Sequence, residues 1–324
     1  MNTKSLRVSS AAVTGARHLR DARNGQDAAV SAVVALPLGK RAVDVVGSGS
    51  RSAAVVVVCD GCGSGASSEV GARLGARAVL GAITRRLAGQ RAELHSKLDA
   101  MRLDVTSLDV TSLDATTLGV TTLDVTSLDE NFWRAVRADV VAFLGDIARR
   151  LPGQLEDVVH DYLLFTIVAA VVIDETAYVW AIGDGAYAID GMVRELGPFA
   201  NNQPPYIAYD LIGTPAVAHT ATARVRASVL VATDGSAEMR TRDELSIARM
   251  SRDPAAFVSN PDALRRFLTK QAKSEERIDW TAQRVIRTPA ALQDDGAIGL
   301  IVRDDADERG DADERNDADA QRLS

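Results

Sequence analysis

The chain has 324 residues, of which 46% are hydrophobic and 25% are charged, a composition typical of one large or two small globular domains. Its aromatic content of 4% argues against nucleic-acid modules that stack bases on aromatic rings. Residues 304–324 carry nine acids and three arginines, hence −6 of the net charge of −7, so the rest of the chain lacks the basic field that holds a phosphate backbone.

The N-terminal stretch MNTKSLRVSS lacks the apolar core of a signal peptide. The longest apolar run, residues 163–173, is too short to span a bilayer and predicts a buried strand. The two cysteines, Cys59 and Cys62, form a C-x-x-C pair, which is a redox pair, half of a zinc site or a structural feature. No second pair and no nearby histidine at ligand spacing accompanies them, so we favour the structural interpretation and expect a reducing cytoplasm.

Apolar, β-branched runs of strand length follow one another along the chain. They predict a hairpin of residues 28–38 and 42–46, and strands at residues 55–59, 163–173, 177–182, 229–233 and 297–302.

Three helices are legible between these strands. The first follows residue 66, with Ser67 or Ser68 as its cap and Glu69 in its first turn. The second carries an apolar stripe at spacings of three and four, which comprises Phe132, Val136, Val140, Phe143, Ile147 and Leu151. The third helix opens in the stretch of residues 260–270, with Asn260 as its cap and Pro261 as its first helical residue.

Two segments stand outside this pattern. Residues 103–127 consist of five pentads of the LDVTS type, whose period matches neither helix nor strand, and they predict a low-complexity insertion. The acidic run of residues 303–324 predicts a disordered tail. A single domain of residues 1–302 remains, in which residues 197–220 form a long loop rich in proline and glycine.

The helices come in a pair rather than after each strand, which argues against a parallel, doubly wound sheet. The sequence therefore predicts the α+β class: antiparallel sheets with helices packed on the outside.

Carboxylates recur where the apolar strands end. Asp60, Asp184, Asp234 and the pair Asp294 and Asp295 each adjoin such a strand and a glycine, and Asp27 precedes another strand. A single Asp-Gly pair is an ordinary turn signal, but strand ends of one sheet can meet at one edge. Clustered carboxylates repel each other unless protons or cations compensate them, and no lysine or histidine recurs beside them.

A pair of divalent cations would supply that compensation. Oxygen ligands select Mg²⁺ or Mn²⁺, and two such ions suit the hydrolysis of phosphoesters by an activated water. The chain has no G-x-S-x-G elbow, no Walker loop and no C-x₅-R loop after Cys62 that would indicate another mechanism.

The ordered motifs GARHLRDARNGQDA, VVVVCDGCGSGASSEVGARLGA, AYVWAIGDGAYAIDG, VLVATDG and DDGAIGLIV resemble those of the metal-dependent protein phosphatases of type 2C, in a divergent bacterial branch. They span residues 14–302. The resemblance implies a two-layer antiparallel β-sandwich flanked by helix pairs. It also implies hydrolysis of phosphoserine or phosphothreonine in a phosphoprotein substrate, in signalling, with two Mn²⁺ or Mg²⁺ ions and a possible third. No nucleic acid or membrane partner is expected, and the chain is expected to be a monomer.

The resemblance also implies roles for individual residues. Asp60 would bridge both ions, the Gly61 carbonyl would bind one, and Asp234 with Asp294, preferred over Asp295, would complete the other. Asp27 would be a ligand or would support the ligands, and Asp184 would hold a third ion. The implied catalytic residues are Asp60 and Asp234. The implied metal-binding residues are Asp27, Asp60, Gly61, Asp184, Asp234, Asp294 and Asp295. The phosphate of the substrate would be bound by Arg17, Arg20 or Arg23.

Two positions depart from the family pattern. Cys62 stands where many relatives carry histidine as general acid, and Gln26 stands where glutamate is frequent. These departures would fit a weak or inactive relative that binds a phosphoprotein or regulatory partner. A metal-dependent hydrolase of small phosphoesters is a further alternative. His18 either faces the site or is an ordinary surface histidine, and surface histidines are the more common case.

Overall fold

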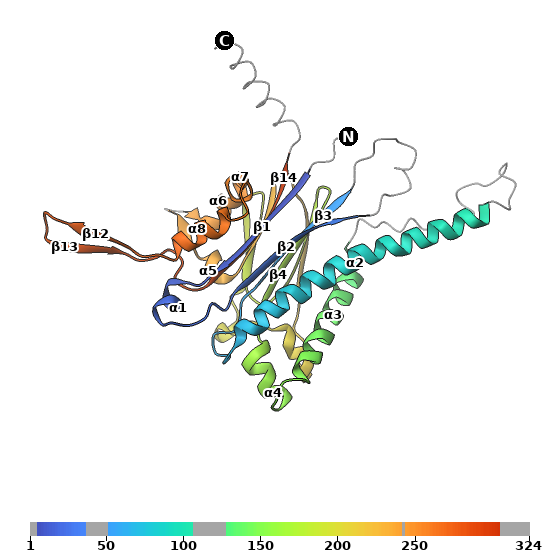
Figure 1. Cartoon of the computed structure of the whole chain (residues 1–324), viewed down its shortest axis with the longest axis horizontal. Helices are drawn as coiled ribbons and strands as arrows, with labels where there is room; N and C mark the ends of the chain where they lie inside the picture. Colours follow the sequence, from blue (N-terminus) through green and yellow to red (C-terminus); the bar gives the residue numbers. More distant parts are fainter. Residues whose placement is uncertain (1–4, 37–50, 106–127, 242–243, 305–324) are drawn as a thin grey trace, which may run out of the picture.

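The structure is a computed structural model that describes residues 5–36, 51–105, 128–241 and 244–304 (Figure 1). Two five-stranded sheets dominate it, and every strand pair within them is antiparallel. The first sheet has the order β1 (Ser5–Val13), β14 (Gly296–Asp304), β9 (Ser228–Ala232), β6 (Gly185–Ile189) and β7 (Met192–Leu196). The second has the order β2 (Ala28–Ala35), β3 (Ser52–Cys59), β4 (Ile167–Ile173), β5 (Thr176–Ile182) and β8 (His219–Arg224).

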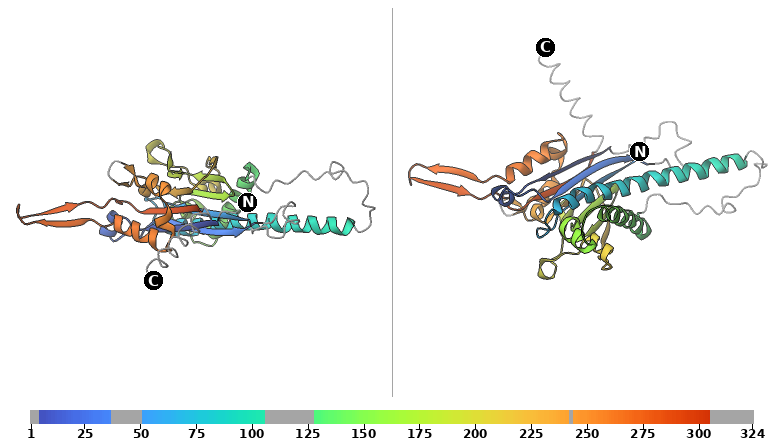
Figure 2. Two further views of the ribbon diagram at one scale, coloured as in Figure 1. Left: turned by 90° about the horizontal axis from the view of Figure 1, so that it is seen from above. Right: turned by 60° about the horizontal axis from the view of Figure 1, so that its bottom comes forward.

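Helices cover the outer faces of both sheets (Figures 1 and 2). The second sheet is covered by α2 (Ser68–Val105) and α3 (Glu130–Ala148), and the first by α6 (Ser246–Arg252) and α8 (Ala263–Gln271). The shorter helices are α1 (Ala16–Arg20), α4 (Leu155–Val158), the π-turn η2 (Val159–Leu163), the 3₁₀ turns η3 (Ala200–Asn202) and η4 (Ile207–Ile212), α5 (Asp234–Ala237) and α7 (Ala255–Val258). The α+β sandwich predicted from the sequence is thereby confirmed. No helix in the described ranges is both long and apolar enough to cross a bilayer.

The alternation of side chains along β3 explains why its sequence is a continuous apolar run. Val55, Val57 and Cys59 point toward α2 and α3, while Val56 and Val58 point into the layer between the two sheets. A strand that is buried on both faces has no position at which a polar side chain could reach water. The three apolar layers therefore follow from the period-two geometry of strands inside a four-layer protein.

Several predicted boundaries shift in the structure. The strand predicted at residues 163–173 begins at Ile167, because η2 occupies the preceding turn. The strand predicted at residues 28–38 ends at Ala35 and pairs with β3, whereas the predicted partner at residues 42–46 lies outside the described residues. Most of the pentad segment and of the tail also lie outside them, although β14 extends to Asp304.

Two helix predictions need correction. In α3 the prediction that Phe143 belongs to the buried stripe is wrong, since its side chain is 40% exposed and Leu144 is buried instead. Leu144 lies three steps of four residues after Phe132, so the buried face of the helix follows the i, i+4 row that joins these two residues. In α8 the cap is Asp262, and Asn260 accepts a hydrogen bond from the Asp262 N–H in the turn before the helix.

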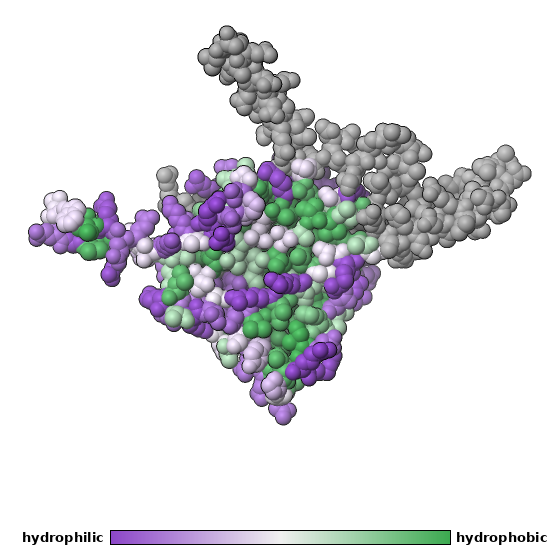
Figure 3. All heavy atoms as spheres, viewed as in Figure 1, coloured by the Kyte–Doolittle hydropathy of each residue, from purple (hydrophilic) through white to green (hydrophobic). Residues whose placement is uncertain are grey.

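A two-stranded arm, β12 (Glu275–Asp279) and β13 (Arg284–Thr288), projects from the body at the end opposite to α2 and was not predicted from the sequence (Figures 1 and 2). Figure 3 shows its surface as mostly hydrophilic with a small hydrophobic patch. Ile278 and Val285 face each other across the arm and are both half exposed. The arm consists mostly of charged side chains and buries no face, so it lacks the periodic burial signal of the sheets. Two further short strands are β10 (Arg240–Thr241) and β11 (Glu244–Leu245).

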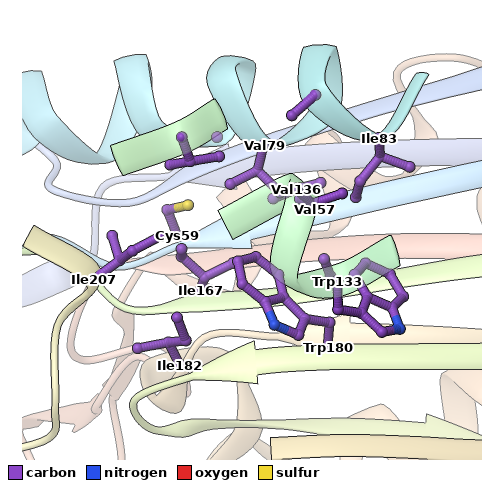
Figure 4. Packing of buried hydrophobic residues seen from close by; sticks show 14 of the residues in the cluster. Val57, Cys59, Val79, Ile83, Trp133, Val136, Ile167, Trp180, Ile182 and Ile207 are labelled. Atoms are coloured by element: carbon purple, nitrogen blue, oxygen red, sulfur yellow. The ribbon is translucent and has the colours of Figure 1, made fainter. Parts of the chain in front are cut away.

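The rings of Trp133 and Trp180 stack in the layer between α3 and β5, with centroids 5.8 Å apart and an angle of 5° between their planes (Figure 4). Because Trp180 is 1% exposed, we expect Trp180→Ala to lower the free energy of unfolding by about 3–5 kcal/mol. Urea denaturation measures this change. Trp280→Ala is the matched control, since Trp280 is 81% exposed, and a comparable loss in that variant would contradict the packing argument.

Candidate active site

The strand register brings the predicted carboxylates to one end of the sandwich. Ala28 pairs with Cys59, so Asp27 and Asp60 lie at the same end of neighbouring strands. In the other sheet, Ala232 pairs with both Ala186 and Ile298, which brings the ends of β9, β6 and β14 together. Asp184 precedes β6, Asp234 follows β9 as the first residue of α5, and Asp294 and Asp295 precede β14.

Three of these carboxyl groups lie beside one another. Asp60 lies close enough to the carboxyl groups of Asp27 and Asp234 to interact with both, and Asp27 Oδ2 accepts a 2.6 Å hydrogen bond from Thr233 Oγ1. Carboxylates at such short range repel each other unless protons or cations compensate them. The chain Asp27–Asp60–Asp234 is therefore a place where negative charge is in excess.

The pKa values of these three carboxyl groups are raised, which agrees with an excess of negative charge. Burial, followed by the charges of Asp27 and Asp234, raises the pKa of Asp60 well above its ordinary value. Burial raises the pKa of Asp27 from 3.8 to about 7, with further contributions from neighbouring carboxylates and an opposing one from its hydrogen bonds. Asp234 lies at the exposed rim, where the surrounding protein removes part of its hydration and raises its pKa.

Asp184 stands in a turn between two glycines. Gly183 and Gly185 have φ angles of +97° and +115°, in the region that L side chains rarely adopt, which explains the spacing of the motif. Burial and the charge of Asp234 raise the pKa of Asp184 to about 6. Its Oδ1 atom is buried without a hydrogen-bond partner, and such an atom is matched by a cation or a proton.

Asp295 has a different environment from its neighbour Asp294. Its Oδ1 accepts the Gly15 N–H at 2.8 Å, and its Oδ2 accepts the Gln26 N–H at 2.6 Å and faces His18 Nδ1 at 2.8 Å. This buried carboxyl ties the segment that contains α1 to the start of β14. The Asp294 side chain is 55% exposed, and a Cβ atom on Gly15 would lie 2.0 Å from the Asp294 carbonyl oxygen, so only glycine fits there.

Gln26 has a structural reason to be an amide. Its Nε2 donates to Ser68 Oγ at 2.8 Å and to the Cys62 carbonyl at 3.3 Å, which a glutamate could not do. Its backbone carbonyl accepts the Gly61 N–H at 3.2 Å. Gln26 thus holds the Asp60–Gly61 turn and the start of α2 in place.

The two cysteines have separate roles. Cys59 is a buried core residue beside Ile167 and Ile207, and both cysteines are free thiols (Figure 4). Cys62 lies in the loop after β3. Partial burial alone would raise the pKa of its thiol, but hydrogen bonds from Ser64 and from Tyr206 lower it. The structural interpretation of the C-x-x-C pair is consistent with this separation.

All three candidate arginines are exposed around α1. Arg23 donates to the Gly63 carbonyl at 3.3 Å, next to the Asp60–Gly61 turn, and Arg20 pairs with Asp21. The Arg17 backbone N–H donates to the Gln293 carbonyl at 2.9 Å, so the backbone of Arg17 lies beside the segment that contains Asp294.

Three site residues were missed or misjudged from the sequence. His18 is buried rather than on the surface, Thr233 supports Asp27, and Tyr206 from the long loop reaches Cys62. Thr233 precedes the Asp-Gly pair of a recognised motif and could have been found there. His18 and Tyr206 carry no local signal, because the residues that they meet lie far away in the sequence.

Comparisons with known proteins identify the family of the chain. The family model of protein phosphatase 2C matches residues 14–279, which confirms the resemblance predicted from the motifs. No curated protein matches the chain in sequence.

Solved structures match over nearly the whole chain at low identity. A point variant of a bacterial serine phosphatase has 12% identity and a TM-score of 0.50, with 93% of this chain and 100% of that chain covered. Serine/threonine phosphatase Stp1 from Staphylococcus aureus has 12% identity and a TM-score of 0.50, with 94% and 98% covered. The catalytic domain of serine threonine protein phosphatase PstP, solved in complex with 2 manganese ions, has 12% identity and a TM-score of 0.40, with 92% and 99% covered.

Proposed function

Because the chain belongs to the protein phosphatase 2C family, we propose that it hydrolyses phosphoserine or phosphothreonine in proteins with the help of two Mn²⁺ or Mg²⁺ ions. The observation that carries this proposal is the close approach of the Asp60 carboxyl to those of Asp27 and Asp234. Carboxylates in such proximity are matched to divalent cations, and their oxygen atoms suit hard ions.

The residues of the site fit such ions. Asp60, Asp234, Asp294 and the Gly61 carbonyl are the proposed ligands, and the unpartnered Asp184 Oδ1 suits a third ion. Asp27 lies next to Asp60 and is held in place by the hydroxyl group of Thr233. Asp295 holds the N-terminal segment through its hydrogen bonds and is not one of the proposed ligands. When bound, the two ions would supply an activated water and neutralise charge on the phosphate.

The remaining chemistry falls to the side chains around the carboxylates. The exposed guanidinium groups of Arg17, Arg20 and Arg23 lie around α1 at the edge of the site, where they can bind phosphate oxygens. Among them Arg23 is the best placed, since it already touches the Gly63 carbonyl of the loop after Asp60. The loop of residues 197–220 brings Tyr206 against Cys62, and we propose that this loop borders the substrate site. The two free thiols fit a reducing cytoplasm, and we propose a cytoplasmic role in signalling.

A second candidate function follows from Cys62. This thiol, in contact with Tyr206 and Ser64, occupies the place at which many relatives have an acid histidine, and Gln26 replaces a frequent glutamate. A weak or inactive phosphatase-like protein that binds a phosphoprotein would have the same metal site with little turnover.

The test is hydrolysis of a phosphothreonine peptide with Mn²⁺, with Mg²⁺ and with chelator. We expect turnover only with metal, and a loss of at least about 100-fold in Asp60→Asn and in Asp234→Asn, because each removes a ligand charge. Asp253→Asn, at an exposed position away from the site, is the control and should keep full turnover. Absence of turnover in folded protein that binds Mn²⁺ would favour the second candidate, and absence of Mn²⁺ binding would contradict both.

A further inference from the structure

His18 is a buried histidine that the proposed function leaves unused. It is 7% exposed and belongs to α1, between β1 and β2. We propose that its Nε2 atom is a ligand of the cation at Asp294, so that the metal site of this chain contains a nitrogen donor. This inference rests on the proposed function, because it concerns the same ion.

The hydrogen bond of the other ring nitrogen fixes which atom is free. Nδ1 lies 2.8 Å from Asp295 Oδ2, and the two Asp295 oxygens also accept the N–H groups of Gly15 and Gln26. A carboxyl group that already accepts from two backbone N–H groups acts as an acceptor toward the ring as well, so Nδ1 carries the hydrogen atom. In the neutral imidazole the lone pair is then on Nε2.

Nε2 faces Asp294 and has no hydrogen-bond partner among the described residues. It lies 3.9 Å from Asp294 Oδ1, which is too long for a hydrogen bond. Nε2 and the Asp294 carboxylate are both acceptors, and a cation between them would match both. Proteins commonly orient a histidine ligand in this way: one ring nitrogen donates its hydrogen atom to a carboxylate, and the other ring nitrogen binds the metal.

The distances suit one ion. Nitrogen and oxygen ligands lie about 2.0–2.2 Å from a first-row transition metal, so two ligands of one ion are at most about 4.2 Å apart. The separation of 3.9 Å is within this limit, and the exposed Asp294 side chain is free to adjust. His18, Asp294 and Asp295 are the group whose candidate ligand atoms all lie within 4.8 Å of one another in the described part of the chain.

A nitrogen ligand changes which metals the site prefers. Carboxylate and carbonyl oxygens suit Mg²⁺, whereas imidazole suits later transition metals. We therefore expect His18→Gln to weaken binding of Co²⁺ about tenfold or more and binding of Mg²⁺ by less than about threefold, with the effect on Mn²⁺ between these two. Glutamine can still hydrogen-bond to Asp295, which limits the effect of the variant on the fold.

The direct test is pulsed electron paramagnetic resonance of Mn²⁺ bound to the full chain. We expect nitrogen modulation that changes when histidine is labelled with ¹⁵N, that persists in His219→Gln and His160→Gln, and that disappears in His18→Gln. His219 and His160 are exposed, which makes them matched controls. Calorimetric titration with Co²⁺, Mn²⁺ and Mg²⁺ measures the expected changes in affinity.

The outcomes separate the two proposals. Stoichiometric Mn²⁺ binding without modulation from histidine nitrogen would overturn the His18 inference and leave the phosphatase proposal intact. Failure of the native chain to bind Mn²⁺ would overturn both. If His18→Gln does not fold, the ¹⁵N label in the native chain and in His95→Gln, His160→Gln and His219→Gln still decides the question by elimination, because these three and His18 are the four histidines of the chain. Modulation that disappears in either control variant would overturn the assignment to His18.

Discussion

Asp295→Asn is expected to lower the free energy of unfolding of the metal-free protein by about 3 kcal/mol. Asp295 accepts hydrogen bonds from the Gly15 and Gln26 N–H groups and faces His18 Nδ1, and all of these residues are buried. An asparagine would turn its NH₂ group toward at least one of these donors. A buried donor without an acceptor destabilises the native state by the full desolvation free energy of that group.

Asp294→Asn is the matched control for this prediction. The neighbouring carboxyl is largely exposed, and its one hydrogen bond to the described residues, from the Asp295 N–H at 2.9 Å, can be kept by the asparagine oxygen. We expect a change within about 0.5 kcal/mol, measured by urea denaturation in chelator. Equal losses in the two variants would mean that the hydrogen bonds of Asp295 do not stabilise the fold.

The second large effect concerns pH. The pKa of Asp27 is raised to about 7 and that of Asp184 to about 6, and those of Asp60 and Asp234 are raised as well. Between pH 4 and 7 the folded, metal-free protein therefore binds more protons than the unfolded chain. Its stability is then highest at low pH and decreases as pH rises through the raised pKa values. The expected loss is on the order of a few kcal/mol, since each pKa unit corresponds to about 1.4 kcal/mol.

Thermal unfolding at pH 5 and pH 8 in chelator measures this effect. We expect a midpoint lower by about 5 °C or more at pH 8. Saturating Mn²⁺ should remove the decrease, because metal ions bind the ionised carboxylates and take the place of the protons. Asp27→Asn should reduce the pH dependence in chelator. A metal-free protein that is more stable at pH 8 than at pH 5 would contradict the carboxylate cluster as the dominant titrating feature.

The sequence was most informative where one physical rule acted locally. The apolar run before Asp60 predicted a strand buried on both faces, and the recurrent Asp-Gly pairs predicted strand ends at one edge, which the register of β2, β3, β6, β9 and β14 confirms. The ordered motifs then predicted the family. These signals depend on a few neighbouring residues and on the alternation of side chains along a strand.

The sequence was least informative where the argument depends on distant partners. Nothing near His18 indicates that its ring is buried against a carboxyl 277 residues away. The same is true of Tyr206 and Cys62, which meet only after the long loop has folded back. The arm of β12 and β13 gives no periodic burial signal because both of its faces meet solvent.

The pairing of β1 with β14 has a consequence for synthesis on the ribosome. β1 is an edge strand whose neighbour in the sheet is β14, and their register joins Ser5 to Asp304 and Val13 to Gly296. At about 5–20 residues per second, β1 waits roughly 15–60 s for its partner to emerge. Until then the nascent chain carries Asp27, Asp60 and Asp234 without the two carboxyls that precede β14. The protein therefore completes the candidate active site as one of its last folding events, so a chain that ends before β14 lacks the carboxyl of Asp294 that we propose as a metal ligand.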